Sequence, residues 1–166
     1  MNKVIMKISQ ALINPYLIIT FFGSRGYLKW MSDEKYLMIM HKARFKEKLN
    51  LKHPKTFNEK LNWLKLFDRK MEYKDMTDKL KVREYIKERI GEEYLIPLLG
   101  VWDNFKDINF EILPEKFVLK CTHDSGSTII YDKNDEINLN ALEKFFNKKL
   151  KFDYYWYSRE WNYKDI

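Results

Sequence analysis

Cysteine is almost absent from the sequence, and several common catalytic motifs are absent altogether. The one cysteine, Cys121, cannot form an internal disulfide, so a reducing cytoplasm is the simplest location. The three histidines stand at no ligand spacing with one another or with this cysteine, and we expect no metal site. No nucleophile-elbow motif, Walker A loop, zinc finger or RNA-binding signature is present, and nucleic acid is not an expected partner.

Long hydrophobic runs are also scarce. Residues 11–23 are apolar, but Asn14 and Pro15 interrupt them, and the run is too short to cross a bilayer. No small-residue cleavage site follows it, so we expect no secretory signal. Packing of this segment onto the rest of the protein is favoured. Peripheral attachment to the inner face of the membrane, beside basic residues such as Lys3 and Arg25, is the alternative.

The composition predicts a folded, basic protein. Hydrophobic residues make up 45% of the chain and aromatic residues 16%, which is enough to form a core. The net charge of +7 favours anionic partners, although the acidic residues are interspersed with the basic ones and also fit an ordinary solvated surface.

The order of predicted elements favours the α+β class, with N-terminal helices followed by a small mixed subdomain. Helices are expected over residues 33–48, from Thr56 with a capping box to Glu59, and over residues 74–90. Three extended segments follow, "EYLIPLLGVW", "KFVLKC" and "STIIYD", of which the last two form a hairpin. Asn138 caps a last amphipathic helix. No element of the chain is expected to cover the aromatic C-terminal segment, so we expect it to pack on something beyond Ile166.

The segment "EKFVLKCTHDSGST" carries the most suggestive chemistry. Lys120 ends a strand, and the small and polar residues after it can turn successive backbone N–H groups toward an anion. A plain hairpin with a solvated lysine is the alternative, and on spacing alone it is favoured.

Four longer phrases, in order, change that balance: "HPKTFNEKLNWLKLFDRK", "TDKLKVREYIKERIGEEYLIPLLGVWD", "LPEKFVLKCTHDSGST" and "YYWYSREWNYKDI". Over nearly the whole chain they resemble the TupA-like ATP-grasp family of bacterial cell-surface polysaccharide biosynthesis, whose members are often labelled glycosyltransferases. In ATP-grasp proteins the nucleotide lies between two α+β subdomains.

The resemblance implies a set of nucleotide-binding residues. Lys120 would be the strand lysine, and the following loop would cover the phosphates, with its tip at residues 125–127. Residues Lys79 and Arg83 would lie one turn apart on one helical face, for which an ordinary solvated face is the alternative. Family loops usually have a second glycine where this chain has a serine. The implied set is Lys79, Arg83, Lys120, His123, Asp124, Ser125, Gly126, Ser127 and Thr128.

The resemblance also implies an organisation and a reaction. Residues 1–50 would be an N-terminal helical region and residues 51–166 the first half of an ATP-grasp domain, with the second subdomain and its magnesium ligands beyond Ile166. The complete family is expected to use ATP and magnesium to activate a carboxylate as an acyl phosphate. An amine then forms an amide on an acidic glycan, and the expected partners are therefore a nucleotide and a glycan or amino-acid substrate. We expect little or no turnover from these residues alone.

Two other readings stay open. One is a glycosyltransferase of the same pathway, although no DxD pair supports it from chemistry. The other is a non-catalytic module that docks on a membrane or a polysaccharide-assembly complex through its basic, aromatic surface.

Overall fold

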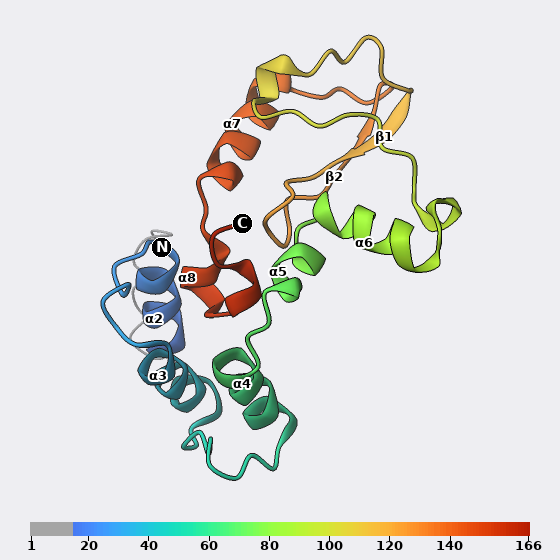
Figure 1. Cartoon of the computed structure of the whole chain (residues 1–166). Helices are drawn as coiled ribbons and strands as arrows, with labels where there is room; N and C mark the ends of the chain where they lie inside the picture. Colours follow the sequence, from blue (N-terminus) through green and yellow to red (C-terminus); the bar gives the residue numbers. More distant parts are fainter. Residues whose placement is uncertain (1–14) are drawn as a thin grey trace, which may run out of the picture. The chain divides into compact units, whose positions relative to one another are not determined.

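The computed structural model describes residues 15–166, and the predictions made for residues 1–14 lie outside them (Figure 1). The chain forms two compact units. The first, here called the helical unit, runs to Met71 and includes Tyr154–Lys164, and the second, the hairpin unit, comprises Glu72–Asp153 and Asp165–Ile166. The family-based boundary near residue 50 stays a prediction. Within the described residues, no helix has both the length and the apolar character needed to cross a bilayer.

The helical unit contains α2 (Pro15–Ser24), α3 (Asp33–Phe45), α4 (Phe57–Phe67), α8 (Tyr154–Ser158) and the 3₁₀ turn η3 (Trp161–Tyr163). The starts of α3 and α4 are set by local caps. The Ser32 hydroxyl accepts from the N–H of Lys35 at 3.4 Å, and the predicted capping box is confirmed, with Thr56 and Glu59 each accepting from the other's N–H. Helix α3 ends before the predicted residue 48 because Lys46 is left-handed, with φ 64°.

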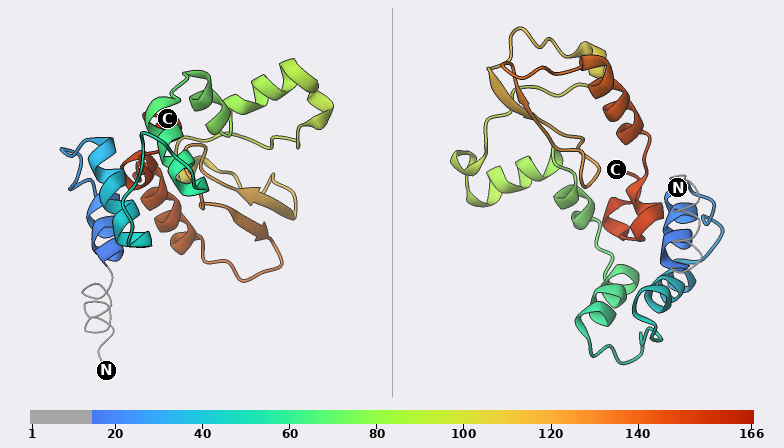
Figure 2. Two further views of the ribbon diagram at one scale, coloured as in Figure 1. Left: turned by 90° about the horizontal axis from the view of Figure 1, so that it is seen from below. Right: turned by 180° about the vertical axis from the view of Figure 1, so that it is seen from behind.

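The core of the helical unit is small and centred on α3. Helix α2 contacts both α3 and α8, and the three helices lie together in both views of Figure 2. The buried residues Tyr36, Leu37 and Leu49 form this core. Apolar side chains that pack against it from the surrounding elements are Ile19, Leu28, Met31, Met40, Leu51 and Leu66.

The aromatic C-terminal segment is part of this unit, so the prediction that no element of the chain covers it is wrong. Arg159 is 1% exposed, and its Nη1 and Nη2 donate to Asp33 Oδ1 at 3.0 Å and to the Leu28 carbonyl at 2.6 Å. The Tyr155 hydroxyl also donates to Asp33. Burial would raise the pKa of Asp33, but the hydrogen bonds from Tyr155 and Arg69 and the charge of Arg159 hold it below its usual value.

The hairpin unit begins with two short helices, α5 (Glu72–Thr77) and α6 (Lys81–Ile90), where the sequence predicted one helix over residues 74–90. Asp78 causes the break: its Oδ1 accepts from the N–H of Leu80 at 2.8 Å and of Lys81 at 3.2 Å, and so caps α6. The break places Lys79 before α6. The prediction that Lys79 and Arg83 share one helical face is therefore wrong.

The sheet is a single hairpin, as predicted for the last two extended segments. Strands β1 (Lys116–Leu119) and β2 (Ile129–Asp132) pair antiparallel, with Phe117 opposite Tyr131 and Val118 opposite Ile130 (Figure 1). The expected third strand does not form among the described residues: the chain after the 3₁₀ turn η1 (Glu92–Tyr94) is extended but unpaired.

The core of the hairpin unit lies between one face of the hairpin and helix α7 (Leu139–Leu150). Helix α7 begins where predicted, since the Asn138 side chain accepts from the N–H of Ala141 at 3.0 Å. The 3₁₀ turn η2 (Phe105–Asp107) adds Phe105 to the core. The described chain is thus α+β, as expected. The core residues are Phe105, Leu113, Phe117, Leu119, Cys121, Tyr131, Leu142 and Phe146.

Candidate functional site

The loop that joins β1 to β2 is anchored by two buried polar residues. Ser127 is 1% exposed and Asp124 is 2% exposed. The Ser127 hydroxyl donates to Asp124 Oδ1 at 2.5 Å and accepts from the N–H of Cys121 at 2.8 Å. These two bonds close the base of the loop across six residues of chain, from Cys121 to Ser127. The base of the loop is therefore fixed from inside, in a place where water cannot replace either bond.

Lys79 braces the same loop from outside the hairpin. Its backbone N–H donates to the Thr122 carbonyl at 3.1 Å, and its ammonium donates to the carbonyls of Thr122 and Asp124. The break between α5 and α6 makes this possible, because a helical Lys79 would give its N–H to the preceding turn. Burial lowers the pKa of the Lys79 ammonium, the Asp124 carboxylate opposes that effect, and the charge of Lys120 adds to it.

Helix α7 supplies a third support for the loop. Lys149 Nζ lies 3.7 Å from Asp124 Oδ2, and His123 Nε2 lies 3.3 Å from the Lys149 carbonyl. Within the described residues, Asp124 Oδ2 has no hydrogen-bond donor, so Lys149 is its nearest charge partner. The ion pair of Lys149 with Asp124 and the hydrogen bond of His123 connect the start of the loop to the last turn of α7.

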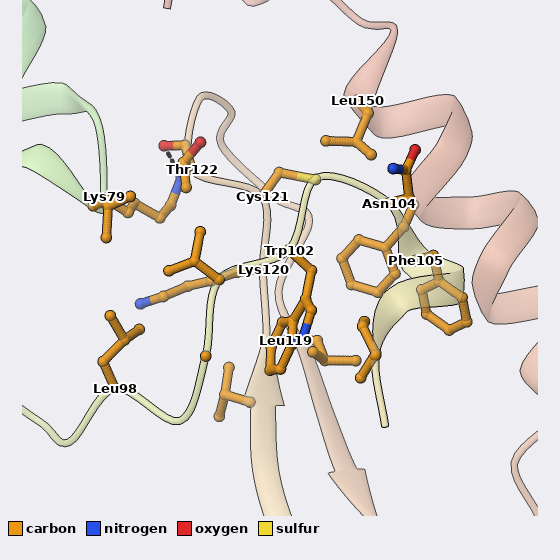
Figure 3. Close-up of a pocket in the computed structure, with 16 residues that line it drawn as sticks. Lys79, Leu98, Trp102, Asn104, Phe105, Leu119, Lys120, Cys121, Thr122 and Leu150 are labelled. Carbon is orange, nitrogen blue, oxygen red and sulfur yellow. Dashed lines mark hydrogen bonds between the residues drawn. The ribbon is translucent and has the colours of Figure 1, made fainter. Parts of the chain in front are cut away.

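Beside the end of β1 lies a cavity of about 190 Å³ with mostly apolar walls. In the view of Figure 3, Lys79, Lys120 and Leu98 lie on one side, Phe105 and Leu150 lie on the other, and Trp102 lies between them. Lys120 follows directly on the last residue of β1, and its side chain is exposed. An apolar pocket with two ammonium groups at one side is suited to a ligand that joins a flat ring to an anionic group.

The predicted loop residues occupy different environments. Ser125, Gly126 and Thr128 are exposed, whereas Asp124 and Ser127 are buried in the loop base. Gly126 has φ 100°, a left-handed backbone conformation that favours glycine, although a Cβ at this position would meet nothing within 4 Å.

Only two of the predicted site residues, Lys79 and Lys120, line the cavity. Arg83 does not join them, since its Nη1 donates to the Ile96 carbonyl at 2.9 Å. The apolar wall was not predicted as part of the site. Its signal in the sequence is the run from Leu98 to Trp102, which is too apolar for the exposed loop it forms.

The chemistry available at this site is binding and charge neutralisation. Burial raises the pKa of the Cys121 thiol, which lines the cavity, so the residue stays a protonated thiol and is not an activated nucleophile. In the described part of the chain, no three histidine, cysteine or acidic side chains come together in a group able to hold a metal ion. Of the two lysines that line the cavity, Lys79 is held by loop carbonyls, whereas Lys120 is exposed.

Comparison with known proteins gives one match. A family model described as TupA-like ATPgrasp matches residues 59–166, which include the hairpin, its loop, the cavity and the aromatic segment. No curated protein and no solved structure matches the chain with significance.

Proposed function

Because the chain belongs to the TupA-like ATP-grasp family, we propose that its hairpin unit binds ATP in the cavity at the end of β1. Lys120 would contact the phosphates, and the exposed loop tip would close over them. The observation that supports this proposal most directly is the position of Lys120 at the rim of an apolar cavity, one residue beyond the strand.

The walls of the cavity suit the two ends of a nucleotide. Leu98, Val101 and Trp102 offer apolar contact for a purine ring, and an aromatic side chain adds stacking energy. Asn104 lines the same cavity, and although its Nδ2 donates to Asp107 Oδ2 at 3.1 Å, its second amide hydrogen and its Oδ1 would be a donor and an acceptor for the edge of the base. The ammonium groups of Lys79 and Lys120 give the opposite charge to the phosphates, in surroundings that exclude part of the water.

The loop and its braces would have different roles. The exposed tip, at Ser125 and Gly126, would turn backbone N–H groups toward the phosphates. The buried pair Asp124 and Ser127 would hold the base of the loop in place, so that less conformational entropy is lost when the tip closes. Lys79 already donates to two loop carbonyls, and its part would be to position the loop as well as to add charge.

For the reaction, we propose the transfer that the family resemblance implies. The γ-phosphoryl group would pass from ATP to a substrate carboxylate, leaving ADP and an acyl phosphate. A substrate amine would then form the C–N bond of an amide, releasing inorganic phosphate and a proton. An acidic glycan and an amino acid are the proposed substrates. Lys120 and the loop N–H groups would stabilise the charge on the moving phosphoryl group.

Magnesium would neutralise further phosphate charge in such a reaction. The described residues offer no group of three suitable ligands, so we assign the ion no ligand in this chain.

The binding step can be tested with the full chain and a fluorescent ATP analogue, with and without magnesium. We expect saturable binding, and weaker binding by roughly ten-fold or more for Lys120→Ala, since a charge-assisted contact contributes about 1.5–3 kcal/mol. Lys144→Ala removes an exposed lysine on α7, outside the cavity, and is the matched control. Equal binding by both variants, or no binding at all, would contradict the proposal. Sugar release from a nucleotide-sugar donor without ATP binding would instead support a glycosyltransferase.

A further inference from the structure

Helix α2 packs on the rest of the helical unit through one face only. Ile19 packs against the core of that unit, and Gly23, one turn later on the same face, is buried. A Cβ at Gly23 would collide with the hydroxyl of Tyr36, so α2 approaches α3 closely at this point. Packing on the protein, which the sequence favoured for the apolar run of residues 11–23, therefore uses only one side of the described part of that run.

The opposite face of α2 is apolar and exposed. Ile18, Phe21 and Phe22 lie three or four positions apart, share this face and are between 37% and 49% exposed. The ring centroid of Phe22 lies 5.3 Å from that of Phe21 and 5.8 Å from that of Tyr27, which is 63% exposed. These four side chains, here called the α2 patch, are neighbours on the surface, whereas the exposed apolar side chains of most proteins are scattered singly.

The charged residues of α2 and of the turn after it are both positive. Arg25 continues the exposed face three positions after Phe22, and its guanidinium lies 3.6 Å from the ring centroid of Phe21. Its Nη1 donates to the Phe21 carbonyl at 3.2 Å, which uses one of the five N–H donors of the guanidinium. Asp33 is the first acidic residue of the sequence. Among residues 15–166, no carboxylate forms a salt bridge with Arg25 or Lys29.

We propose that the α2 patch docks on the surface of an anionic lipid bilayer. The apolar side chains enter the boundary between the headgroups and the acyl chains, where the exposed faces of Phe21 and Phe22 lose their contact with water. The guanidinium of Arg25 stays over the Phe21 ring and donates its remaining N–H groups to lipid phosphates. Tyr27 lies at the interface, with its ring toward the acyl chains and its hydroxyl in the headgroup layer.

The combination of charge and apolar surface distinguishes a bilayer from the other occupants of such a face. A second copy of the chain, related by a two-fold axis, would bring the cations of one α2 patch toward those of the other. A soluble phosphate would satisfy Arg25 but leave the phenylalanine rings in water. An anionic bilayer offers a negative surface above a hydrocarbon layer, so the arginine and the rings contribute to the same contact.

Co-sedimentation of the full chain with lipid vesicles tests the proposal. We expect binding to vesicles of phosphatidylcholine and phosphatidylglycerol in equal amounts, weaker binding to phosphatidylcholine alone, and a decrease with added salt. Replacing Phe21 and Phe22 together by serine should weaken binding by roughly ten-fold or more, because it removes most of the buried apolar area. Arg25→Gln should weaken it by roughly five-fold, since a basic residue near an anionic surface contributes about 1 kcal/mol. Phe57→Ser and Lys60→Gln, which change exposed residues of α4, are the matched controls.

Four outcomes overturn the proposal: no binding to the anionic vesicles, equal binding to neutral and anionic vesicles, unchanged binding by Arg25→Gln, or release of the chain by soluble glycerol phosphate at matched ionic strength. A wild-type chain that is dimeric in solution and monomeric as the double-serine variant would assign the α2 patch to a second copy, and would also overturn it. The inference does not rest on the nucleotide site. The double-serine variant should bind the ATP analogue as the wild type does, so the failure of one proposal is distinguishable from the failure of the other.

Discussion

The hydroxyl of Ser127 offers the sharpest test of how the loop is built. Its replacement by alanine removes the acceptor for the N–H of Cys121, at 2.8 Å, and the donor to Asp124 Oδ1, at 2.5 Å. Both partners belong to buried residues, so neither regains a bond from water at no cost. A buried polar group left unsatisfied costs about 1–3 kcal/mol, and more when it is charged, so we expect Ser127→Ala to lower the free energy of unfolding by about 2–4 kcal/mol.

Urea unfolding followed by circular dichroism measures this loss. For a slope of about 2 kcal/mol per molar urea, the midpoint falls by roughly 1–2 M. Ser125→Ala is the matched control, because Ser125 is exposed at the tip of the same loop, and exposed substitutions stay within about 0.5 kcal/mol. A Ser127→Ala midpoint equal to that of Ser125→Ala would refute the argument that a buried hydroxyl closes the loop.

Two further predictions concern the helical unit. Arg159→Met leaves the Asp33 carboxylate without its most buried partner and should lower the free energy of unfolding by about 3–5 kcal/mol. Arg69→Met removes a more exposed partner of the same carboxylate and should lower it by at most about 1 kcal/mol. Similar losses for the two variants would contradict this expectation. Hydrogen bonds from the backbone of Thr56 and Lys55 lower the pKa of Glu59 from 4.5 to about 2, so the stability contributed by the capping box is present above pH 4.5 and is lost as the pH falls toward 2. In urea titrations at a series of pH values, Glu59→Ala should differ from the wild type at neutral pH and converge with it near pH 2; a constant difference would show that the carboxylate charge is not involved.

The elements that were predicted correctly have causes within a few residues of chain. The capping box at Thr56 and the Ser32 and Asn138 caps each depend on a side chain that bonds a nearby backbone group. The hairpin depends on two segments rich in β-branched and aromatic residues that lie close together in the chain. Such bonds recur wherever the same residues appear in the same order, and for that reason a single sequence reveals them.

The wrong predictions have two causes: a side chain with two possible local roles, and contacts between residues far apart in the sequence. Asp78 lies inside an apolar pattern that continues from α5 into α6, and the pattern does not show that its carboxylate will cap the second helix instead of continuing the first. The aromatic segment after residue 153 is covered by residues more than a hundred positions earlier, such as Asp33, which Arg159 reaches across 126 positions. No periodicity in the segment itself encodes that partner.

The candidate site contains features that the sequence predicted and features that it did not. Lys120 and the loop were predicted from a strand, a lysine and a run of small residues, together with the family resemblance. The cavity wall at Leu98 and Trp102 was not, because those residues come from a segment whose extended path is decided by packing against the hairpin and not by pairing with it.

The structure also separates residues that the family resemblance treated as one set. Asp124, Ser127 and Lys79 spend their hydrogen bonds on the loop itself, so their replacement should first change the stability and order of the loop. Among the described residues, Lys120 has no hydrogen bond or salt bridge that its removal would break, and its ammonium remains available to an anion in the cavity. The resemblance places a second glycine at the position of Ser127, and a glycine has no hydroxyl to close the base of the loop. The base of this loop is therefore held by a side chain that a double-glycine loop lacks, so a loss of nucleotide binding without a loss of stability is expected of Lys120→Ala and not of Ser127→Ala.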